Sequence, residues 1–315
     1  MNAHKMLAAK VEKLLARIAA RGARSPPALP SARPFGEPVR NVVAFSGGVD
    51  SSLAAALVQQ VFPTTSAACI GRSAALSATQ LQQARDVAAH IGLPLWECRT
   101  EEAKLEGYVA NQGKSCYYCK TTLYATLNQV AAFTWQKMQQ HDGNDNASTE
   151  ELKPVLYNGT NADDQLDPTR FDVVSPLSEL TKQEVRDVAK YLGLPNWNAA
   201  ASPCLRSRLQ FGVEATQDHL HRVERAEDFV RELVQLETHM NMRVRFLAGN
   251  RAAVGTLTLP VTRVDRLKPN ITMETLVLNA ELDNEALKKA MPQSKAIDAE
   301  LRRFGRRLTD LDRGC

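Results

Sequence analysis

Residues 41–52 read NVVAFSGGVDSS and join an apolar run to a glycine-rich turn. The run at residues 41–45 is short and β-branched, which is typical of a buried strand in a parallel sheet. Gly47 and Gly48 let the backbone turn tightly and approach an anion without a Cβ in the way. The helix expected at residues 53–61 would point its free N–H groups at the same place. The segment therefore predicts an α/β fold with an anion-binding loop.

Strand and helix signals continue to alternate after this segment. Strands separated by helices of about 10–15 residues are typical of βαβ units and of a doubly wound parallel sheet. The further strands are expected at residues 66–70, 95–98 and 154–156, and the helices at residues 77–91 and 182–192. Beyond about residue 206 the pattern becomes that of a smaller α+β domain. Its elements are expected to be a long charged helix at residues 216–236, strands at 242–247 and 254–259, and a helix at 284–290.

These patterns divide the chain into three regions. Residues 1–39 hold an amphipathic helix and a proline-rich linker, residues 40–205 the nucleotide-binding domain, and residues 206–315 the α+β domain. Within the second region, residues 139–150 are polar and poor in apolar side chains, which predicts a surface insertion. The first 40 residues carry eight Lys or Arg and two acids. A helix docked on the protein explains that charge pattern, and a mitochondrial targeting segment is the alternative.

The composition is that of an ordinary folded chain. Of the 315 residues, 44% are hydrophobic and 23% are charged, and no apolar run reaches the roughly 18 residues that cross a bilayer. The net charge of +4 is too small to require a nucleic acid partner, and small anionic molecules explain it equally well. Six cysteines are too few for a disulfide framework, and no signal peptide precedes them. We therefore expect a soluble, cytoplasmic protein whose paired cysteines serve metal or redox chemistry.

The turn at residues 46–52, SGGVDSS, has the composition of a phosphate cradle. Its serine hydroxyls and backbone N–H groups would face the anion, but it lacks the lysine of a Walker A loop. Asp50 in such a cradle would repel phosphate unless a hard cation lay between them, so the turn predicts Mg²⁺ as well as a nucleotide. A plain glycine turn with a serine helix cap is the alternative.

A second polar segment, NGTNADD at residues 158–164, follows the strand expected at residues 154–156. Ligands of open α/β sheets collect at the carboxyl ends of the strands. Asp163 and Asp164 are therefore candidates to hold Mg²⁺ or a substrate. A polar turn with a helix cap is the alternative.

Cys116 and Cys119 form a C-x-x-C pair, a pattern found in metal sites, in redox sites and in cysteines without a special role. No second pair completes a zinc site with four ligands. Together with Cys204 the pair supplies three thiolates, which suit an iron–sulfur cluster with one open iron better than closed zinc. The other cysteines are expected to be small core residues or, for the last, part of a frayed terminus: Cys69, Cys98 and Cys315.

Cys204 lies in a non-periodic loop together with Arg206 and Arg208. Nearby positive charges favour the thiolate, so we expect a lowered pKa for this thiol. The thiolate is the form that attacks carbon and binds metal. A buried structural cysteine is the alternative. The two arginines and Lys120 are candidates to neutralise the phosphate and carboxylates of a substrate.

The turn SGGVDSS resembles the PP-loop of the ATP pyrophosphatase superfamily, and NGTNADD is similar to a second segment of it. Members of that superfamily cleave ATP between the α and β phosphates and pass AMP to an acceptor. Further stretches narrow the resemblance, namely CYYCK, SPLSELTKQEVRDVAKYLGLP, PCLRSRLQFG and VERAEDFVREL, in that order. Over about residues 40–250 the chain is thereby similar to the LarE family of ATP-dependent sulfur transferases.

The resemblance implies a reaction on pyridinium-3,5-biscarboxylic acid mononucleotide, the precursor of the nickel-pincer nucleotide cofactor. ATP would adenylate a ring carboxylate, sulfur would displace AMP, and a thiocarboxylate would remain. Asp50 would be catalytic and, with Asp164, would bind Mg²⁺. The ATP-binding residues implied by the resemblance are Ala44, Ser46, Gly47, Gly48, Val49, Asp50, Ser51, Ser52 and Gly159.

The family also implies two sources of sulfur. In one class the cysteine that matches Cys204 donates its own sulfur and becomes dehydroalanine. In the other class that cysteine joins a C-x-x-C pair to hold a [4Fe–4S] cluster whose open iron carries the sulfide. The presence of Cys116 and Cys119 is typical of the cluster class, which allows repeated turnover.

The chain departs from the family pattern in the second domain. Residues 243–245, RVR, match, but residues 246–249 and 252–255 replace a histidine–glycine pair and a strand with an acidic residue. Acidic residues of the charged helix could contribute to the remaining polar site: Glu224, Glu227 and Asp228.

Two other functions are alternatives to a LarE-type sulfur transferase. One is a PP-loop thiolase or ligase with another acceptor such as tRNA, although the mild charge does not favour RNA. Another is a non-catalytic nucleotide-binding or cluster-binding protein. The expected partners are a small nucleotide substrate and further copies of the chain, with neither a membrane nor a nucleic acid.

Overall fold

The computed structural model describes residues 3–22, 39–142, 154–164, 173–237, 240, 242–248, 276–282 and 284–305. The chain forms two compact units. The first comprises Met1–Ser73, Ala78–Thr100 and Cys119–Ala199, and the second comprises Ala74–Ser77, Glu101–Tyr118 and Ala200–Cys315. The second unit therefore includes two short segments from within the region expected to form the nucleotide-binding domain.

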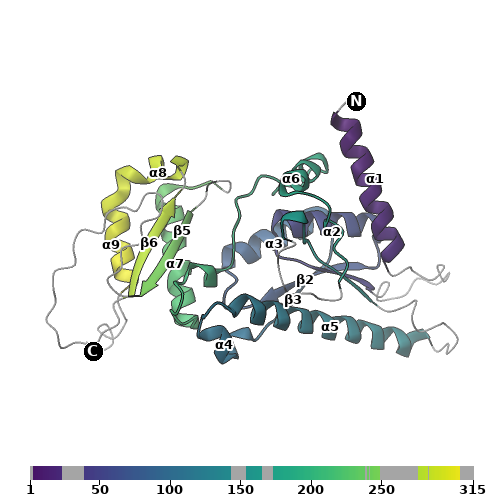
Figure 1. Ribbon diagram of the computed structural model, residues 1–315, viewed down its shortest axis with the longest axis horizontal. Coiled ribbons are helices and arrows are strands. Elements are labelled where there is room, and N and C mark those ends of the chain that lie inside the picture. The colour runs from purple at the N-terminus through teal and green to yellow at the C-terminus, as the bar shows by residue number, and fades with distance from the viewer. Residues whose placement is uncertain are drawn as a thin grey trace. The chain divides into compact units, whose positions relative to one another are not determined.

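A four-stranded parallel sheet forms the centre of the first unit (Figure 1). Its strands are β1 (Asn41–Ala44), β2 (Ser66–Arg72), β3 (Leu95–Arg99) and β4 (Val155–Tyr157), in the order β3-β2-β1-β4. Helices connect the parallel neighbours, as parallel pairing requires. This arrangement confirms the α/β class with a doubly wound parallel sheet.

Helices cover both faces of this sheet, with α2 and α3 on one side and α5 on the other (Figure 1). Their bounds are Val49–Val61 for α2, Ala78–Ile91 for α3 and Ser115–Asp142 for α5. The sequence patterns did not predict the α5 helix, and its last residues, 139–142, belong to the expected surface insertion. Residues 143–150 of that insertion lie outside the described residues.

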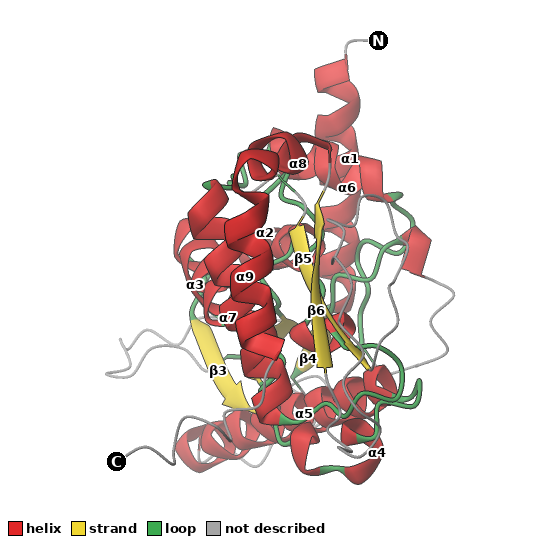
Figure 2. Ribbon diagram, turned by 90° about the vertical axis from the view of Figure 1, so that its left-hand side faces the viewer, coloured by secondary structure: helices red, strands yellow, loops and turns green. Residues whose placement is uncertain are grey.

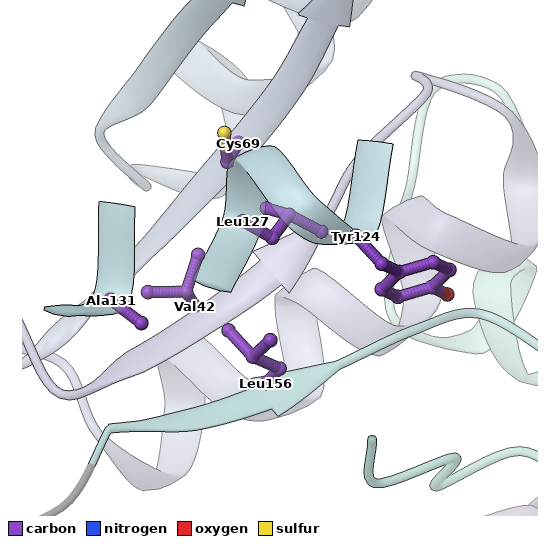
Figure 3. Packing of buried hydrophobic residues seen from close by; sticks show 6 residues of the cluster. All are labelled: Val42, Cys69, Tyr124, Leu127, Ala131 and Leu156. Atoms are coloured by element: carbon purple, nitrogen blue, oxygen red, sulfur yellow. The ribbon is translucent and has the colours of Figure 1, made fainter. Parts of the chain in front are cut away.

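Side chains of α5 pack onto the sheet in one apolar cluster (Figure 3). Val42 on β1 and Leu156 on β4 are at most 7% exposed, and Leu127 of α5 is fully buried against them. Cys69 of β2 is fully buried in the same cluster, and its thiol lies 3.0 Å from the sulfur of Cys98 on β3. Burial is the main cause of the raised pKa of the Cys69 thiol.

The strand order places the two polar loops side by side. From β1 the chain adds β2 and β3 on one side, and it then returns to place β4 on the other side of β1. The loops that leave β1 and β4 therefore lie next to each other at the carboxyl edge, which is the switch point where such sheets bind ligands.

The helix α1 (Ala3–Arg21) packs against α2 and against α6 (Lys182–Tyr191). Its apolar stripe is buried, with Val11 at 7%, Leu14 at 4% and Ile18 at 0% exposure. On the polar side, Lys10 forms an ion pair with Glu184 of α6 at 2.6 Å. The proline-rich linker expected to follow this helix lies outside the described residues.

The second unit contains an antiparallel pair of strands, β5 (Met242–Ala248) and β6 (Leu276–Leu282) (Figure 2). The helix α7 (Gln217–Val234) packs against β5, α9 (Ser294–Gly305) packs against β6, and the two helices contact each other. The strand expected at residues 254–259 lies outside the described residues. The shorter elements are α4 (Glu106–Val109), α8 (Asn284–Ala290) and the 3-10 turns η1 (Glu102–Lys104), η2 (Ala162–Asp164), η3 (Leu205–Arg208) and η4 (Met291–Gln293). No helix in the described parts of the chain is both long and apolar enough to cross a membrane.

Candidate functional site

The loop after β1 has a backbone that only glycine fits. Gly47 has a φ of +73°, a conformation that side chains with a Cβ disfavour. A Cβ at this position would also lie 2.8 Å from the Cα of Ala84 on α3. The loop therefore turns directly over α3 and leads into α2 at Gly48.

Hydrogen bonds among its own serines shape this loop. The Ser51 hydroxyl donates to the Gly48 carbonyl at 3.0 Å and accepts from the Ser46 N–H at 3.2 Å. The Gly48 N–H in turn donates to the Ser46 hydroxyl at 3.3 Å. Gly48 is the N-cap of α2 and has no side chain to cap the helix, so the first-turn N–H groups and the positive end of the helix dipole face the loop. This is the arrangement that binds phosphate.

The expected ATP-binding residues differ in exposure. Ser46 and Gly48 are exposed, whereas Val49, Ser51 and Ser52 are buried. The last of these is fully buried, and its hydroxyl accepts from the amide of Asn196 at 3.0 Å. The half-buried Ala44 packs against the apolar cluster of α5. The exposed surface of the loop is thus formed by Ser46 and Gly48, and the buried serines hold its shape.

The loop after β4 lies against the loop after β1. A Cβ at Gly159 would lie 2.6 Å from the Ser51 nitrogen and 2.7 Å from the Asp50 carbonyl carbon. Since both of these atoms belong to backbone, no side chain fits between the two loops. Gly159 is therefore required for their close contact.

Asp50 is held by two residues from other segments of the first unit. The amide of Asn161 donates to Asp50 Oδ1 at 3.0 Å, and the ammonium of Lys182 forms an ion pair with Asp50 Oδ2. Asp50 and Lys182 remain partly exposed, with 24% and 38% of their side chains accessible. Lys182 thus places a positive charge beside Asp50, separately from the Mg²⁺ that the sequence predicts there.

The acidic pair of residues 163 and 164 stabilises the same corner. Asp163 accepts from the Lys182 N–H at 2.8 Å, and Asp164 accepts from the Asn161 N–H at 3.2 Å. Both carboxylates are exposed. No group of three His, Cys, Asp or Glu side chains among the described residues is arranged to hold a metal ion, so Mg²⁺ binding by Asp50 and Asp164 stays a prediction.

Sequence reasoning did not assign Lys182, Asn161 or Asn196 to the site. A signal for Lys182 was present, because Thr181 and Glu184 form a capping box that fixes the first residue of α6. The box places Lys182 at the start of that helix, but only the fold brings it to Asp50. Asn196 donates to Gly47 O at 2.8 Å as well as to Ser52, and no local pattern indicates these long-range contacts.

The Cys204 loop belongs to the second unit, and the structure corrects one prediction about it. The pKa of the Cys204 thiol is raised, because burial outweighs the other effects. A hydrogen bond from the Ser207 backbone and the charges of Arg206 and Arg208 act in the opposite direction, while Cys116 adds to the rise. The predicted lowering was wrong because local sequence shows the arginines but not the depth of the thiol.

The C-x-x-C pair lies in the first turns of α5. Cys116 is exposed, and its sulfur lies 3.9 Å from Arg206 Nη1, whereas Cys119 is half-buried and belongs to the first unit. Lys120 is also half-buried. These thiols and Cys204 are not arranged as a metal-binding group where the structure describes them. The [4Fe–4S] cluster therefore stays a prediction.

The two arginines after Cys204 have different environments. Arg208 is 3% exposed and binds the carboxylate of Glu227, with Nε 2.9 Å from Oε1. Arg206 is half-buried, and its Nε is inaccessible and has no hydrogen-bond partner in the described chain. Of the other acidic candidates on α7, Glu224 is half-buried and Asp228 is exposed.

Comparison with known proteins connects this chain to a small set of relatives, and no family model matches it. An uncharacterized protein of Synechocystis, slr1717, is 31% identical over 245 residues, which cover 77% of this chain and 85% of the relative. The pyridinium-3,5-bisthiocarboxylic acid mononucleotide synthase of Lactiplantibacillus plantarum is 27% identical over 66% of this chain and 71% of the relative. An uncharacterized protein of Methanocaldococcus jannaschii, MJ0830, is 24% identical over 62% of this chain and 70% of its own length.

These relations extend well beyond the short motifs. They cover most of the chain and most of each relative, and the fold places the two motif loops at residues 46–52 and 158–164 against each other. With these relatives and this parallel sheet, the chain belongs to the LarE family of sulfur transferases.

Proposed function

We propose that the protein is an ATP-dependent sulfur transferase that acts on pyridinium-3,5-biscarboxylic acid mononucleotide. It would adenylate a ring carboxylate and convert it to a thiocarboxylate, a step in the synthesis of the nickel-pincer nucleotide. The name of the Lactiplantibacillus relative supports the substrate class. The structural observation that carries the proposal is the exposed loop of Ser46 and Gly48 at the start of α2, packed at the switch point of a parallel sheet.

The first unit provides the features for binding a triphosphate. The first-turn N–H groups of α2 and the ammonium of Lys182 would meet the phosphate oxygens. The carboxylates of Asp50 and Asp164 are oxygen ligands of the kind that Mg²⁺ takes, and the bound ion would neutralise charge on the phosphates. Lys182 would then pass from Asp50 to the nucleotide, since both partners attract the same ammonium.

The chemistry begins with activation, because a carboxylate is a poor electrophile at neutral pH. A carboxylate oxygen of the substrate attacks the α-phosphorus of ATP, and pyrophosphate leaves with the electrons of the broken P–O bond. The Cys204 thiolate then attacks the adenylated carbonyl, and AMP leaves, so that a thioester joins the substrate to Cys204. Loss of the Cys204 α-proton with cleavage of its Cβ–S bond gives the thiocarboxylate and dehydroalanine.

An AMP assay tests the first half of this proposal. We expect AMP and pyrophosphate to form from ATP only with the pyridinium substrate present. Asp50→Asn should abolish this activity, whereas Asp187→Asn, an exposed carboxylate on α6, should retain it. AMP formation only with RNA would favour a tRNA acceptor, and no AMP with any acceptor would favour a non-catalytic nucleotide-binding protein.

A second experiment tests the sulfur donor. Cys204→Ala should keep pyrophosphate formation, which accompanies adenylation, and lose thiocarboxylate formation. The spent wild-type chain should lack one H₂S by mass. The donor that the C-x-x-C pair predicts, a [4Fe–4S] cluster, would instead give visible absorbance after anaerobic purification and several products per chain. Cys116→Ser should remove that absorbance, and Cys98→Ser is the matched control. A colourless wild-type protein would exclude the cluster and leave Cys204 as the donor.

A further inference from the structure

We propose that the buried ion pair of Arg208 and Glu227 is a positioning device for Cys204, and that Arg208 does not bind substrate. The inference rests on the proposed function only in taking Cys204 as the sulfur site. Arg208 is 3% exposed and Glu227 is 7% exposed. A substrate carboxylate therefore cannot reach this guanidinium without displacing Glu227.

The guanidinium of Arg208 binds the main chain of the sulfur-carrying loop. Its Nη1 donates to the carbonyl of Pro203 and to that of Cys204, the latter at 3.1 Å. Its Nε and Nη2 donate to the two carboxylate oxygens of Glu227 at 2.9 and 3.4 Å. The Arg208 side chain thus connects the carbonyls before and after the Cys204 N–H to the carboxylate of Glu227.

Glu227 extends this connection to the body of the second unit. It lies on the buried face of α7, and its Oε1 also accepts from the backbone N–H of Val244 on β5 at 3.0 Å. The loop itself continues into the sheet, where the Gln210 N–H donates to Phe246 O at 2.9 Å. The ion pair therefore joins the Cys204 loop to a helix and a strand at once.

The carbonyl of Cys204 is the most strongly held atom of the loop. Besides Arg208, it accepts from the Ser207 N–H at 2.9 Å and from the Ser207 hydroxyl at 2.7 Å. On the next residue, the Leu205 N–H donates to Ala75 O at 2.9 Å. The Cys204 carbonyl and the Leu205 N–H belong to the same peptide group, and both are hydrogen-bonded. Cys204 therefore keeps one backbone conformation, which limits the directions in which its sulfur can point.

The energetics argue that such a pair has a role besides stability. Taking two charges out of water is costly, and a pair of apolar side chains fills the same space at no loss of stability in many proteins. Here the charges supply hydrogen bonds to two carbonyls that apolar side chains could not make. Arg206 is only half-buried, so of the two arginines after Cys204 it is the one that an anion can reach.

The test is a double variant, Arg208→Met with Glu227→Met, which removes both charges and leaves neither unpaired. Amide hydrogen exchange of residues 205–209 and alkylation of Cys204, with the exposed Cys116 as internal reference, are measured on the protein alone. Because the loop loses its bonds to a charged donor, both rates should rise at least about tenfold. With substrates, thiocarboxylate formation should fall while pyrophosphate formation, which accompanies adenylation, persists.

The control is Asp218→Asn, which removes the exposed carboxylate of an ion pair with Arg222 on the same helix and should change none of these rates. If the double variant does not fold, the same rates are measured on Arg208→Lys. An ammonium cannot bond the carboxylate and both carbonyls in the same geometry, so these rates should rise in this variant too. Wild-type exchange and alkylation in a folded variant would overturn the proposal, as would wild-type thiocarboxylate formation. The exchange and alkylation measurements need no ATP or acceptor. They therefore test the positioning of Cys204 even if the proposed function is wrong.

Discussion

The loop after β1 and the loop of Cys204 are both short and polar, but different forces hold them. Backbone fit shapes the first, through the φ of Gly47 and the contact of Gly159 with residues 50 and 51. Its ion pair, Asp50 with Lys182, is 24% and 38% exposed. The ion pair of the second loop, Arg208 with Glu227, is 3% and 9% exposed by side chain. An ion pair near water can exchange partners, as the proposed nucleotide site requires, whereas a buried pair holds the backbone around Cys204 in place.

The largest effect should come from breaking the buried pair on one side only. Glu227→Ala leaves the Arg208 charge buried without its anion, and we expect a loss of about 3–5 kcal/mol in the free energy of unfolding. Urea denaturation measures this loss. Asp218→Asn removes an exposed carboxylate from an ion pair of the same helix. If Glu227→Ala lowers the free energy of unfolding no more than Asp218→Asn does, the claim that different forces hold the two loops is wrong.

The next effect should come from the backbone contact of the first loop. Gly159→Ala places a Cβ 2.6 Å from the Ser51 nitrogen, and overpacking of this kind costs about 1–3 kcal/mol. Thermal unfolding is the measurement. Gly48→Ala is the matched control for stability, because its Cβ would lie 3.4 Å from the Ser46 hydroxyl at an ordinary φ of −74°. Equal losses in the two variants would contradict the role given to backbone fit.

A smaller change in stability, with a clear change in binding, is expected for Lys182→Met. A partly exposed ion pair contributes about 0–1 kcal/mol, so the free energy of unfolding should change little. The affinity for ATP should fall about tenfold, the value of one hydrogen bond from a charged donor. Calorimetric titration of ATP checks this, with Lys190→Met, a lysine stacked on Trp197 at the other end of α6, as the control. An unchanged affinity for ATP would show that Lys182 does not bind the nucleotide.

The smallest effect concerns the exposed pair between α1 and α6. Lys10 and the cap at Thr181 lower the pKa of Glu184 from 4.5 to about 2. A lowered carboxyl pKa gives stability that is present above pH 4.5 and is lost as the pH falls toward 2. The urea midpoint should therefore decrease over this interval, and less so in Lys10→Met. If Lys10→Met shows the same pH dependence as the wild type, the lowered pKa of Glu184 is due to the cap at Thr181 alone.

The sequence predicted what depends on local pattern. The strands at residues 41–45 and 66–70 and the helix at residues 182–192 lie within two residues of their observed bounds, because apolar period and caps are local signals. The rule on strand ends predicted that residues 158–164 lie at the carboxyl edge of the sheet, but their contact with the loop after β1 depends on the pairing of β4 with β1, which no local pattern indicates. Burial is not a local signal, and this is why the pKa of Cys204 was predicted in the wrong direction. The pairing of Lys182 with Asp50 was equally hidden, since 132 positions separate them.

The docking of α1 has a practical consequence for work with this protein. Val11, Leu14 and Ile18 are buried where α1 packs on α2 and α6, so these residues belong to the core of the first unit. A shortened form that starts at the β1 strand would uncover this packing surface and leave Glu184 without its lysine. We therefore expect variants that lack α1 to aggregate on expression, whereas the full chain should stay in solution.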